Sequence, residues 1–502
     1  MKIVDSARRL QQAAFPFVEM LAGMAVAQAL AVVQVHLSNR ELLAALEAAA
    51  AAGYLPVPNR NLWPELSALE SAFHGGVFFA LSVGAGLSLV AACAGAFAAA
   101  AGTRRFPVLI LWGGLILFVN AEGFSLFPTL YAVFVPPVAF VLAEGGFRGA
   151  ERAARRSALL TRLLPLGVLA LAWSTQYDRG LFTAIRDRLL LSNPVGEAVH
   201  DYYYRWTLYP AEAFKSPAQK QIRTVRLEID PAEKETAAVA TALAARDVLP
   251  VAQERGAQFA AVAAGGLLRF SRDGRPLAET KIGSFLARPD AVLENVFHAA
   301  DRMAPFRRLV FFTFLFGFPS ALYLAAYAFV RIQAAPLLPK ARQAEALAAL
   351  LCFSVAALVL ALFVSGRERT EAAGPPPAQI ESLAPPAQAA ALRALLARGQ
   401  DLTTVLPDWP SLARSPDPRV RALLARGLAA SPSPQAGPVL ALLLGDPHLH
   451  VRTAAIEATG RRGGRRAREA LLLLLERSHT WYDQFYAYRV LRSLGWKQTA
   501  AS

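Results

Sequence analysis

The sequence predicts an α-helical polytopic membrane protein with about seven transmembrane helices, an inserted small α+β domain and a C-terminal α-solenoid. Three observations predict this fold class. Hydrophobic residues make up 55% of the 502-residue chain, more than an ordinary soluble protein carries. A polar stretch over residues 176–307 interrupts a series of long apolar runs. Near the C-terminus a helical pattern returns after 31 residues.

Seven apolar runs approach the roughly 20 residues that a helix needs to cross the hydrocarbon core of a bilayer. They cover 13–36, 75–101, 106–121, 124–145, 158–175, 308–331 and 345–365, and the third and fifth are the shortest. The length of the first run favours an uncleaved anchor over a secretory signal. We therefore expect a membrane block over residues 1–175, with two further spans within 308–365.

Lysine and arginine are concentrated in four connecting segments. The N-terminus and the segments 103–105, 148–162 and 331–342 hold thirteen of them, whereas the loop 37–73 holds only Arg40 and Arg60. Cytoplasmic loops are enriched in these residues, and seven spans place all four basic segments on one side. We expect a bacterial inner (plasma) membrane protein with a cytoplasmic N-terminus, and with its central and C-terminal domains on the far side.

Five polar residues at or near the apolar runs are candidates for a role in the membrane. Glu19, Asn120 and Glu122 are candidates for an ion or proton path, because burying such groups in lipid is costly. Alternatively, Glu19 lies close to the interface and residues 120–123 form a turn. His36 and His74 fall at the same depth and are candidate axial ligands of a haem, or else plain interfacial histidines.

The first part of the polar insert, residues 176–216, is aromatic and basic, with an amphipathic helix expected over 182–191. The run Tyr202, Tyr203, Tyr204 and Trp206 favours a segment at the membrane–water boundary, in contact with lipid, or a surface that binds a ligand or partner protein. The nearby Glu197, His200 and Asp201 resemble an acid–base cluster. No nucleophile or metal-ligand set accompanies them in the sequence.

Residues 217–307 have the pattern of a small α+β domain. Strands are expected near 222–229, 247–251, 258–264, 267–271 and 277–282, with helices over 231–246 and 290–303. Asp230-Pro231-Ala232-Glu233 supplies a helix N-cap, a proline at the first helical position and a capping-box acid. The pattern is compatible with a ferredoxin-like sandwich.

A proline-rich tether over residues 366–387 leads to a helical repeat domain over 388–502. Asp417-Pro418-Arg419-Val420-Arg421 returns as Asp446-Pro447 and Val451-Arg452, and a looser third copy covers 481–495. These residues resemble the short HEAT repeats of the phycobilisome-lyase type over about the last 90 residues. The resemblance implies a HEAT-like solenoid that binds proteins, with scaffolding rather than lyase chemistry.

The remaining sequence patterns limit the functions that are possible. Arg461, Arg462, Arg465 and Arg466 share one turn, which is either a solvated loop or a contact for anionic lipid or an acidic partner. The net charge of +15 comes with no motif that reads nucleic acid. We assign no catalytic residue, cofactor or metal ligand, and do not favour an enzyme. The prediction is a membrane scaffold or complex subunit; the alternative is a transporter or a redox (haem or quinone) subunit.

Overall fold

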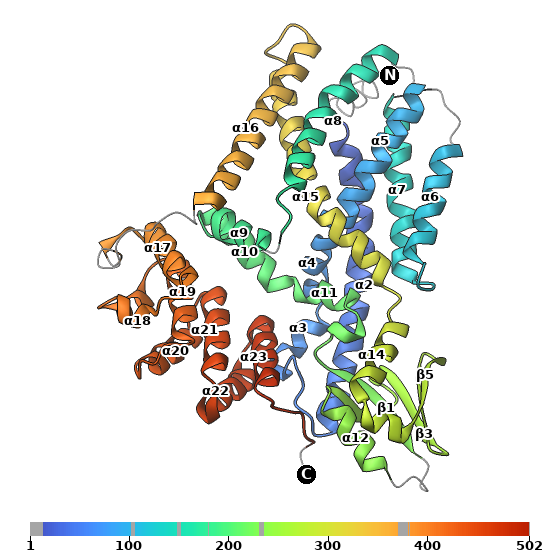
Figure 1. The fold of residues 1–502 in the computed structure, drawn as a ribbon. Coiled ribbons are helices and arrows are strands. Elements are labelled where there is room, and N and C mark those ends of the chain that lie inside the picture. The colour runs from blue at the N-terminus through green and yellow to red at the C-terminus, as the bar shows by residue number, and fades with distance from the viewer. Residues whose placement is uncertain are drawn as a thin grey trace.

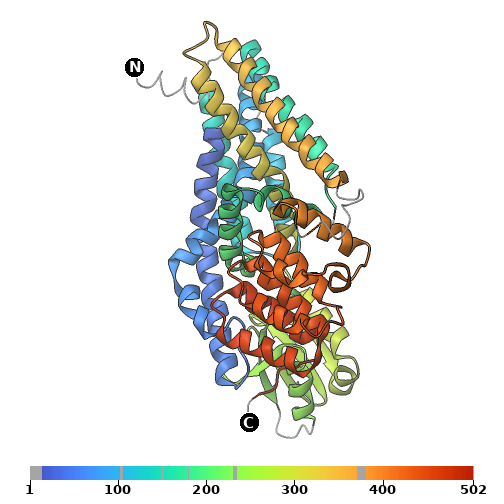
Figure 2. The same cartoon turned by 90° about the vertical axis from the view of Figure 1, so that its left-hand side faces the viewer.

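The computed structural model describes residues 14–101, 106–147, 152–178, 180–229, 235–369, 380 and 382–500. A bundle of apolar helices forms one end of an elongated molecule (Figure 1). A five-stranded sheet and the C-terminal helical repeats lie side by side at the other end. One helix, α2 (Phe17–Ala51), runs from the bundle to the sheet and connects the two ends (Figure 2).

All seven expected apolar runs coincide with helices. These helices are α2, a continuous helix over 69–101 that contains one π-helical turn (α4 Leu69–Phe79, η2 Ala80–Gly84, α5 Ala85–Ala101), α6 (Phe106–Val119), α7 (Leu126–Phe147), α8 (Arg152–Ser174), α15 (Ala304–Ala334) and α16 (Ala341–Arg369). Five segments of the described chain are long and apolar enough to cross a membrane. The other two, Phe106–Val119 and Leu160–Ser174, are shorter. A count of seven spans stays a prediction, because 14 residues of α-helix extend only about 21 Å.

Helix α2 is longer than the sequence indicated. The expected span ended at residue 36 and a loop was expected from residue 37, yet the helix continues to Ala51. Residues 44–51 are mostly alanine, the strongest helix former, and Leu42, Leu46 and Ala49 are buried. At 35 residues the helix extends about 52 Å, beyond the roughly 30 Å of a hydrocarbon core. Its second half lies beyond the bundle and contacts the sheet.

The bundle has a consistent polarity. The joined ends of α5 and α6, of α7 and α8, and of α15 and α16 lie together with the start of α2, away from the sheet (Figure 1). The basic segments expected to mark the cytoplasmic side fall partly outside the described residues, at 1–13, 102–105 and 148–151. The helix ends that flank them share one end of the bundle.

The five expected strands are present, but their order was not predicted. They are β1 (Arg223–Ile229), β2 (Val248–Val251), β3 (Phe259–Ala264), β4 (Leu267–Arg272) and β5 (Arg275–Lys281), in the order β2-β1-β3-β4-β5. β1 is parallel to β2 and β3, and β3, β4 and β5 are antiparallel. A ferredoxin-like sandwich would need a helix between two of the last three strands, so that expectation is wrong.

Three helices complete the domain. They are α12 (Thr236–Ala244), α13 (Ile282–Ala287) and α14 (Pro289–Ala299). The core contains Val225, Leu243, Phe259, Phe270 and Phe285. The capping motif expected at 230–233 lies outside the described residues.

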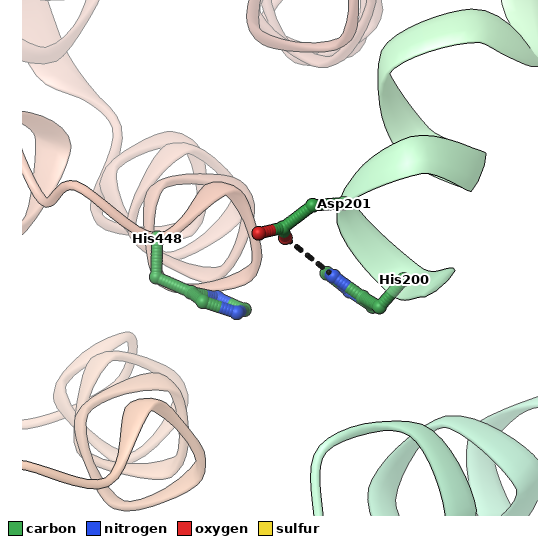
Figure 3. Close-up of side chains that lie close together, drawn as sticks. All are labelled: His200, Asp201 and His448. Carbon is green, nitrogen blue, oxygen red and sulfur yellow. Dashed lines mark hydrogen bonds and ion pairs between the residues drawn. The ribbon is translucent and has the colours of Figure 1, made fainter. Parts of the chain in front are cut away.

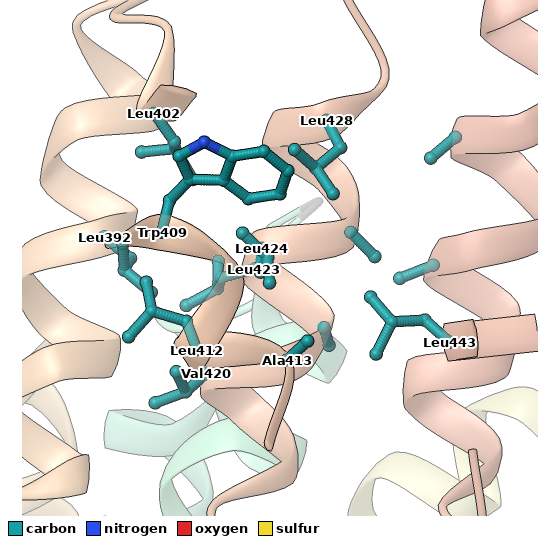
Figure 4. Close-up of a cluster of buried hydrophobic side chains, with 14 of the residues drawn as sticks. Leu392, Leu402, Trp409, Leu412, Ala413, Val420, Leu423, Leu424, Leu428 and Leu443 are labelled. Carbon is teal, nitrogen blue, oxygen red and sulfur yellow. The ribbon is translucent and has the colours of Figure 1, made fainter. Parts of the chain in front are cut away.

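The repeat region stacks α17, α19, α21 and α23, with shorter helices between them (Figure 1). The elements are α17 (Pro385–Ala397), α18 (Leu402–Val405), η6 (Trp409–Arg414), α19 (Pro418–Leu428), α20 (Ala436–Leu444), α21 (Leu449–Arg462), α22 (Gly464–Arg477) and α23 (Trp481–Ser493). Trp409 fills the core between Leu402 and Leu428 (Figure 4). The tether expected over 366–387 is helical at both ends, because α16 continues to Arg369 and α17 begins at Pro385. Residues 370–379 and 381 lie outside the described residues.

A ladder of ion pairs explains the return of the repeat pattern. Arg421 Nε lies 2.7 Å from Asp446 Oδ2 of the next repeat, and Arg452 Nε lies 2.8 Å from Asp483 Oδ2 of the repeat after it. Asp417 caps α19 through the Arg419 amide at 2.8 Å. The second Asp-Pro does not cap a helix in the same way, because α21 begins only at Leu449. Asp446 instead forms the ion pair with Arg421.

Candidate functional site

A bridge of short helices joins the bundle to the repeat region. It consists of α9 (Leu181–Ile185), η3 (Arg186–Leu190), α10 (Pro194–Trp206) and α11 (Leu208–Phe214), and it passes between the two parts (Figure 1). Asn193 begins α10 by accepting a hydrogen bond from the Gly196 amide at 2.9 Å, with Pro194 at the first helical position. The helix expected over 182–191 corresponds to α9 and η3.

His74, one of the two candidate haem ligands, contacts the aromatic run of this bridge. The Trp206 ring stacks on the His74 imidazole with centroids 4.7 Å apart, and the Tyr202 hydroxyl lies 3.2 Å from His74 Nδ1. His36 lies on α2, and its Nδ1 atom is buried without a hydrogen-bond partner among the described residues. The imidazole of His74 is therefore held by aromatic side chains of α10.

The same aromatic run contacts the last repeat. Tyr204 lies 5.0 Å from Tyr482, measured between ring centroids, and 5.2 Å from Tyr203. Burial raises the pKa of Tyr203 to about 12, so its hydroxyl stays protonated at neutral pH. Trp206 is only 6% exposed. Within this chain, these rings pack between α4 and α23.

Polar contacts extend the docking in both directions. Asp187 of η3 lies 3.2 Å from the Arg393 guanidinium of α17, and its carbonyl oxygen accepts from Arg419 Nη1 at 3.2 Å. At the sheet, the Asp247 carboxylate lies 3.0 Å from Arg492 Nε of α23. Asp247 adopts a left-handed backbone with φ of 59°, which aspartate tolerates better than most residues. The repeat region is therefore held by the bridge and by the sheet.

The four arginines of the predicted basic turn divide into two kinds. Arg462 donates to the carbonyl oxygens of Leu428 and Ser431 at 3.1 and 2.6 Å, and so joins its repeat to the preceding one. Arg461, Arg465 and Arg466 are exposed. Arg465 forms an ion pair at 2.7 Å with Glu469, one helical turn away on α22.

The membrane-path candidates lie in separate places. Glu19 is 1% exposed on α2. Asn120 holds the turn between α6 and α7, because its Oδ1 accepts from the Ser125 amide at 2.8 Å and its Nδ2 donates to the Ile116 carbonyl oxygen at 2.9 Å. Glu122 is exposed in that turn. The hydrogen bonds of Asn120 are therefore those of a residue that stabilises a turn.

A buried charge cluster in the bundle was missed by sequence reasoning. Arg162 of α8 is 2% exposed, and its Nη2 lies 3.0 Å from Glu345 Oε1 of α16. Arg331 of α15 contacts the same carboxylate oxygen at 2.7 Å, and Arg162 Nη1 donates to the Phe15 carbonyl oxygen at 2.9 Å. Both arginines belong to segments that were expected to be basic loops, 148–162 and 331–342. Their burial requires such pairing.

One group of side chains in the described chain has the spacing of a metal site. His200, Asp201 and His448 each place one ligand atom within 4.8 Å of the others (Figure 3). Sequence reasoning found no ligand set for His200 and Asp201, because His448 lies in a different domain. The pair His448 and His450 at the start of α21 was the available signal, since the preceding repeat has Asp417 and Arg419 there.

Comparison with known proteins identifies one part of the chain. Residues 406–492 match the family model of HEAT repeats. No curated protein and no solved structure matches the chain. The C-terminal region is a HEAT-repeat region. The predicted HEAT resemblance is thereby confirmed for these residues, and HEAT repeats generally mediate protein–protein interaction.

Proposed function

We propose that this chain is an integral membrane scaffold or complex subunit that binds protein partners through its HEAT region and its α+β domain. The observation that carries the proposal is the HEAT match over residues 406–492 in a chain with five helices able to cross a membrane. A stacked repeat presents an extended surface whose usual ligand is another protein. Its membrane segments would hold that surface at a fixed place.

The docking contacts support a scaffold of fixed geometry. The bridge contacts the N-terminal ends of α19, α21 and α23, and the sheet contacts α23. These faces are used within the chain. Partners then bind the outer helices, where Leu442 of α20 is 58% exposed and Leu473 of α22 is 45% exposed. These exposed leucines, together with the exposed Arg461 and Arg465 of the same repeat region, suit a partner with an apolar and acidic surface.

The basic turn also suits anionic lipid headgroups. We further propose a bacterial inner membrane location with a cytoplasmic N-terminus, and with the α+β and HEAT regions on the far side. The phycobilisome-lyase-type resemblance fits scaffolding without lyase chemistry. An alkaline phosphatase fused at the C-terminus is expected to be active in cells. An inactive fusion of normal abundance would reverse the orientation.

The partner surface is tested by crosslinking in intact membranes, followed by purification and mass spectrometry. We expect the combined change of Arg461, Arg465 and Arg466 to Gln to remove a crosslinked protein that the unchanged chain retains. A matched control replaces three exposed arginines outside the HEAT region and the α+β domain, Arg40, Arg308 and Arg342, by Gln. Equal recovery of the partner with both triple variants would refute the role of the basic turn in partner binding. If the unchanged chain is recovered without any crosslinked partner, the scaffold proposal is refuted.

The burial of Glu19 on an apolar helix favours the second candidate function, a transporter or redox subunit. If the chain moves ions, Glu19→Gln should reduce flux into proteoliposomes by at least tenfold. If His36 and His74 bind haem, purified protein should show a Soret band that is lost in His36→Ala. Unchanged flux and the absence of a Soret band would together remove this alternative.

A further inference from the structure

Three histidines from two domains meet at the docked face of the HEAT region. His200 comes from α10 of the bridge, whereas His448 and His450 flank the start of α21. The His200 ring stacks on the His448 ring with centroids 5.1 Å apart and lies 5.9 Å from the His450 ring. The His200 and His448 rings point toward each other, with the Asp201 carboxylate beside the gap (Figure 3).

One nitrogen of each ring in this cluster lacks a partner among the described residues. The Nε2 atoms of His200, His448 and His450 are all buried with no hydrogen bond to any described residue. Leaving a buried polar atom unsatisfied costs about 1–3 kcal/mol. Three such atoms in one cluster are available to a ligand.

The hydrogen bonds of the cluster limit what that ligand is. His200 Nδ1 lies 3.1 Å from Asp201 Oδ1, which favours a proton on Nδ1 and leaves the Nε2 lone pair free in the ion-free protein. Binding of an ion to the Asp201 carboxylate would replace this hydrogen bond. His448 Nδ1 accepts from the His450 amide at 3.2 Å, so the neutral ring carries its proton on Nε2, where no acceptor is present. A metal ion bound at His448 Nε2 would move the ring proton to Nδ1. The hydrogen bond from the His450 amide would be lost, but the unsatisfied Nε2 donor would be removed as well.

We infer that His200, Asp201 and His448 form a binding site for a divalent transition-metal ion of the Zn²⁺ class, placed between the bridge and the HEAT region. Imidazole and carboxylate are the donors such ions prefer. The three ligand atoms already lie within 4.8 Å of one another. Tetrahedral zinc places its ligands about 3.4 Å apart, so side-chain rotations that move the ligand atoms by up to about 1.4 Å would close the site.

The charges around the site have both signs. Asp201 supplies a negative charge to the proposed ligand set. Arg186 and Arg426 bring positive charge near His450, beside that set. The ion would link α10 to α21 and so strengthen the docking of the HEAT region.

Metal analysis of the full-length protein tests the site. The chain is purified in detergent through a tag without histidine, stripped with a chelator and titrated with Zn²⁺ or Co²⁺. We expect about one bound ion per chain and the visible absorption bands of four-coordinate Co²⁺. His200→Ala and His448→Ala should each weaken binding by at least ~10- to 100-fold, the loss seen even for groups that only orient a ligand.

Controls separate this site from chance binding. His298 and His479 are exposed and lie outside the cluster, so replacing either by Ala should leave Zn²⁺ affinity unchanged. Zn²⁺ should raise the thermal midpoint of the unchanged protein and of both controls, but not that of folded His448→Ala. Equal Zn²⁺ affinity of His448→Ala and His479→Ala would overturn the inference, as would an unchanged protein that binds no Zn²⁺.

Discussion

Asn59 is expected to hold the HEAT region onto the loop that follows α2. Its Nδ2 donates to the carbonyl oxygens of Leu475, Glu476 and Ser478 at 2.7, 3.0 and 3.2 Å. Helices leave their last carbonyl groups without intrahelical donors, and here one side chain supplies donors to the end of α22. Asn59 is 7% exposed, so water does not readily replace it.

Asn59→Ala removes two strong hydrogen bonds and leaves buried carbonyl groups unsatisfied. At about 1 kcal/mol for each bond, plus the cost of unsatisfied acceptors, we expect a loss of about 2–3 kcal/mol in the local stability of α22 and α23. Asn59→Asp keeps the volume but turns a carboxylate toward three carbonyl oxygens, so it should destabilise at least as much. Asn61 is the control, because it is exposed and its Nδ2 contacts are 3.4 and 3.5 Å long.

Hydrogen exchange of the protein in nanodiscs measures this effect. A loss of 2–3 kcal/mol corresponds to amide exchange about 30- to 150-fold faster through local opening. We expect this change in α22 and α23 for Asn59→Ala, and little change for Asn61→Ala. The same protection in both variants would refute the assignment of Asn59 as an inter-domain cap.

Two further predictions concern contacts of the α+β domain and its surroundings. Burial alone would raise the pKa of Glu212, but Lys220 and Lys215, each 3.2 Å away, lower it to about 2. The Glu212 carboxylate stabilises the folded protein fully above its unfolded pKa near 4.3, and this contribution is lost as the pH falls to about 2. The thermal midpoint of Glu212→Gln should therefore lie below that of the unchanged protein at pH 7, and the two midpoints should converge in acid. Gly256 has φ of +95°, and a Cβ there would overlap the carbonyl oxygen of Ala44 on α2. Gly256→Ala should therefore lower the thermal midpoint, whereas Gly274→Ala, whose Cβ would meet nothing, should cost only backbone strain.

Local patterns were enough to predict most individual elements. Apolar runs gave helices, and β1 to β5 were placed close to their observed bounds, because side-chain periodicity and turn residues act over short distances. Helix α2 was the main error in length. The expected span ended at residue 36, yet the helix continues to Ala51 and Asn39 within it is fully buried. Tertiary packing therefore overrode the local polarity.

The docking of the domains could not be predicted in this way. Tyr488 donates to the Asp247 carboxylate, and Gln498 donates to the Leu55 carbonyl oxygen at 2.8 Å. Each partner lies hundreds of residues from the other, and neither sequence position carries a motif. The candidate metal site has the same origin, since His200 gained its neighbour His448 only through the docking.

The aromatic run of α10 shows why composition alone was ambiguous. Tyrosine and tryptophan present an apolar ring and a polar tip, so they suit a lipid interface and a protein interface equally well. In the structure, Tyr204 of this run contacts Tyr482 of the last repeat. Tyr209 of the following helix, α11, contacts Trp481, with ring centroids 5.0 Å apart. A terminal repeat needs a cover for its exposed apolar face. In this chain the bridge provides that cover, so the membrane part and the HEAT region complete each other's cores.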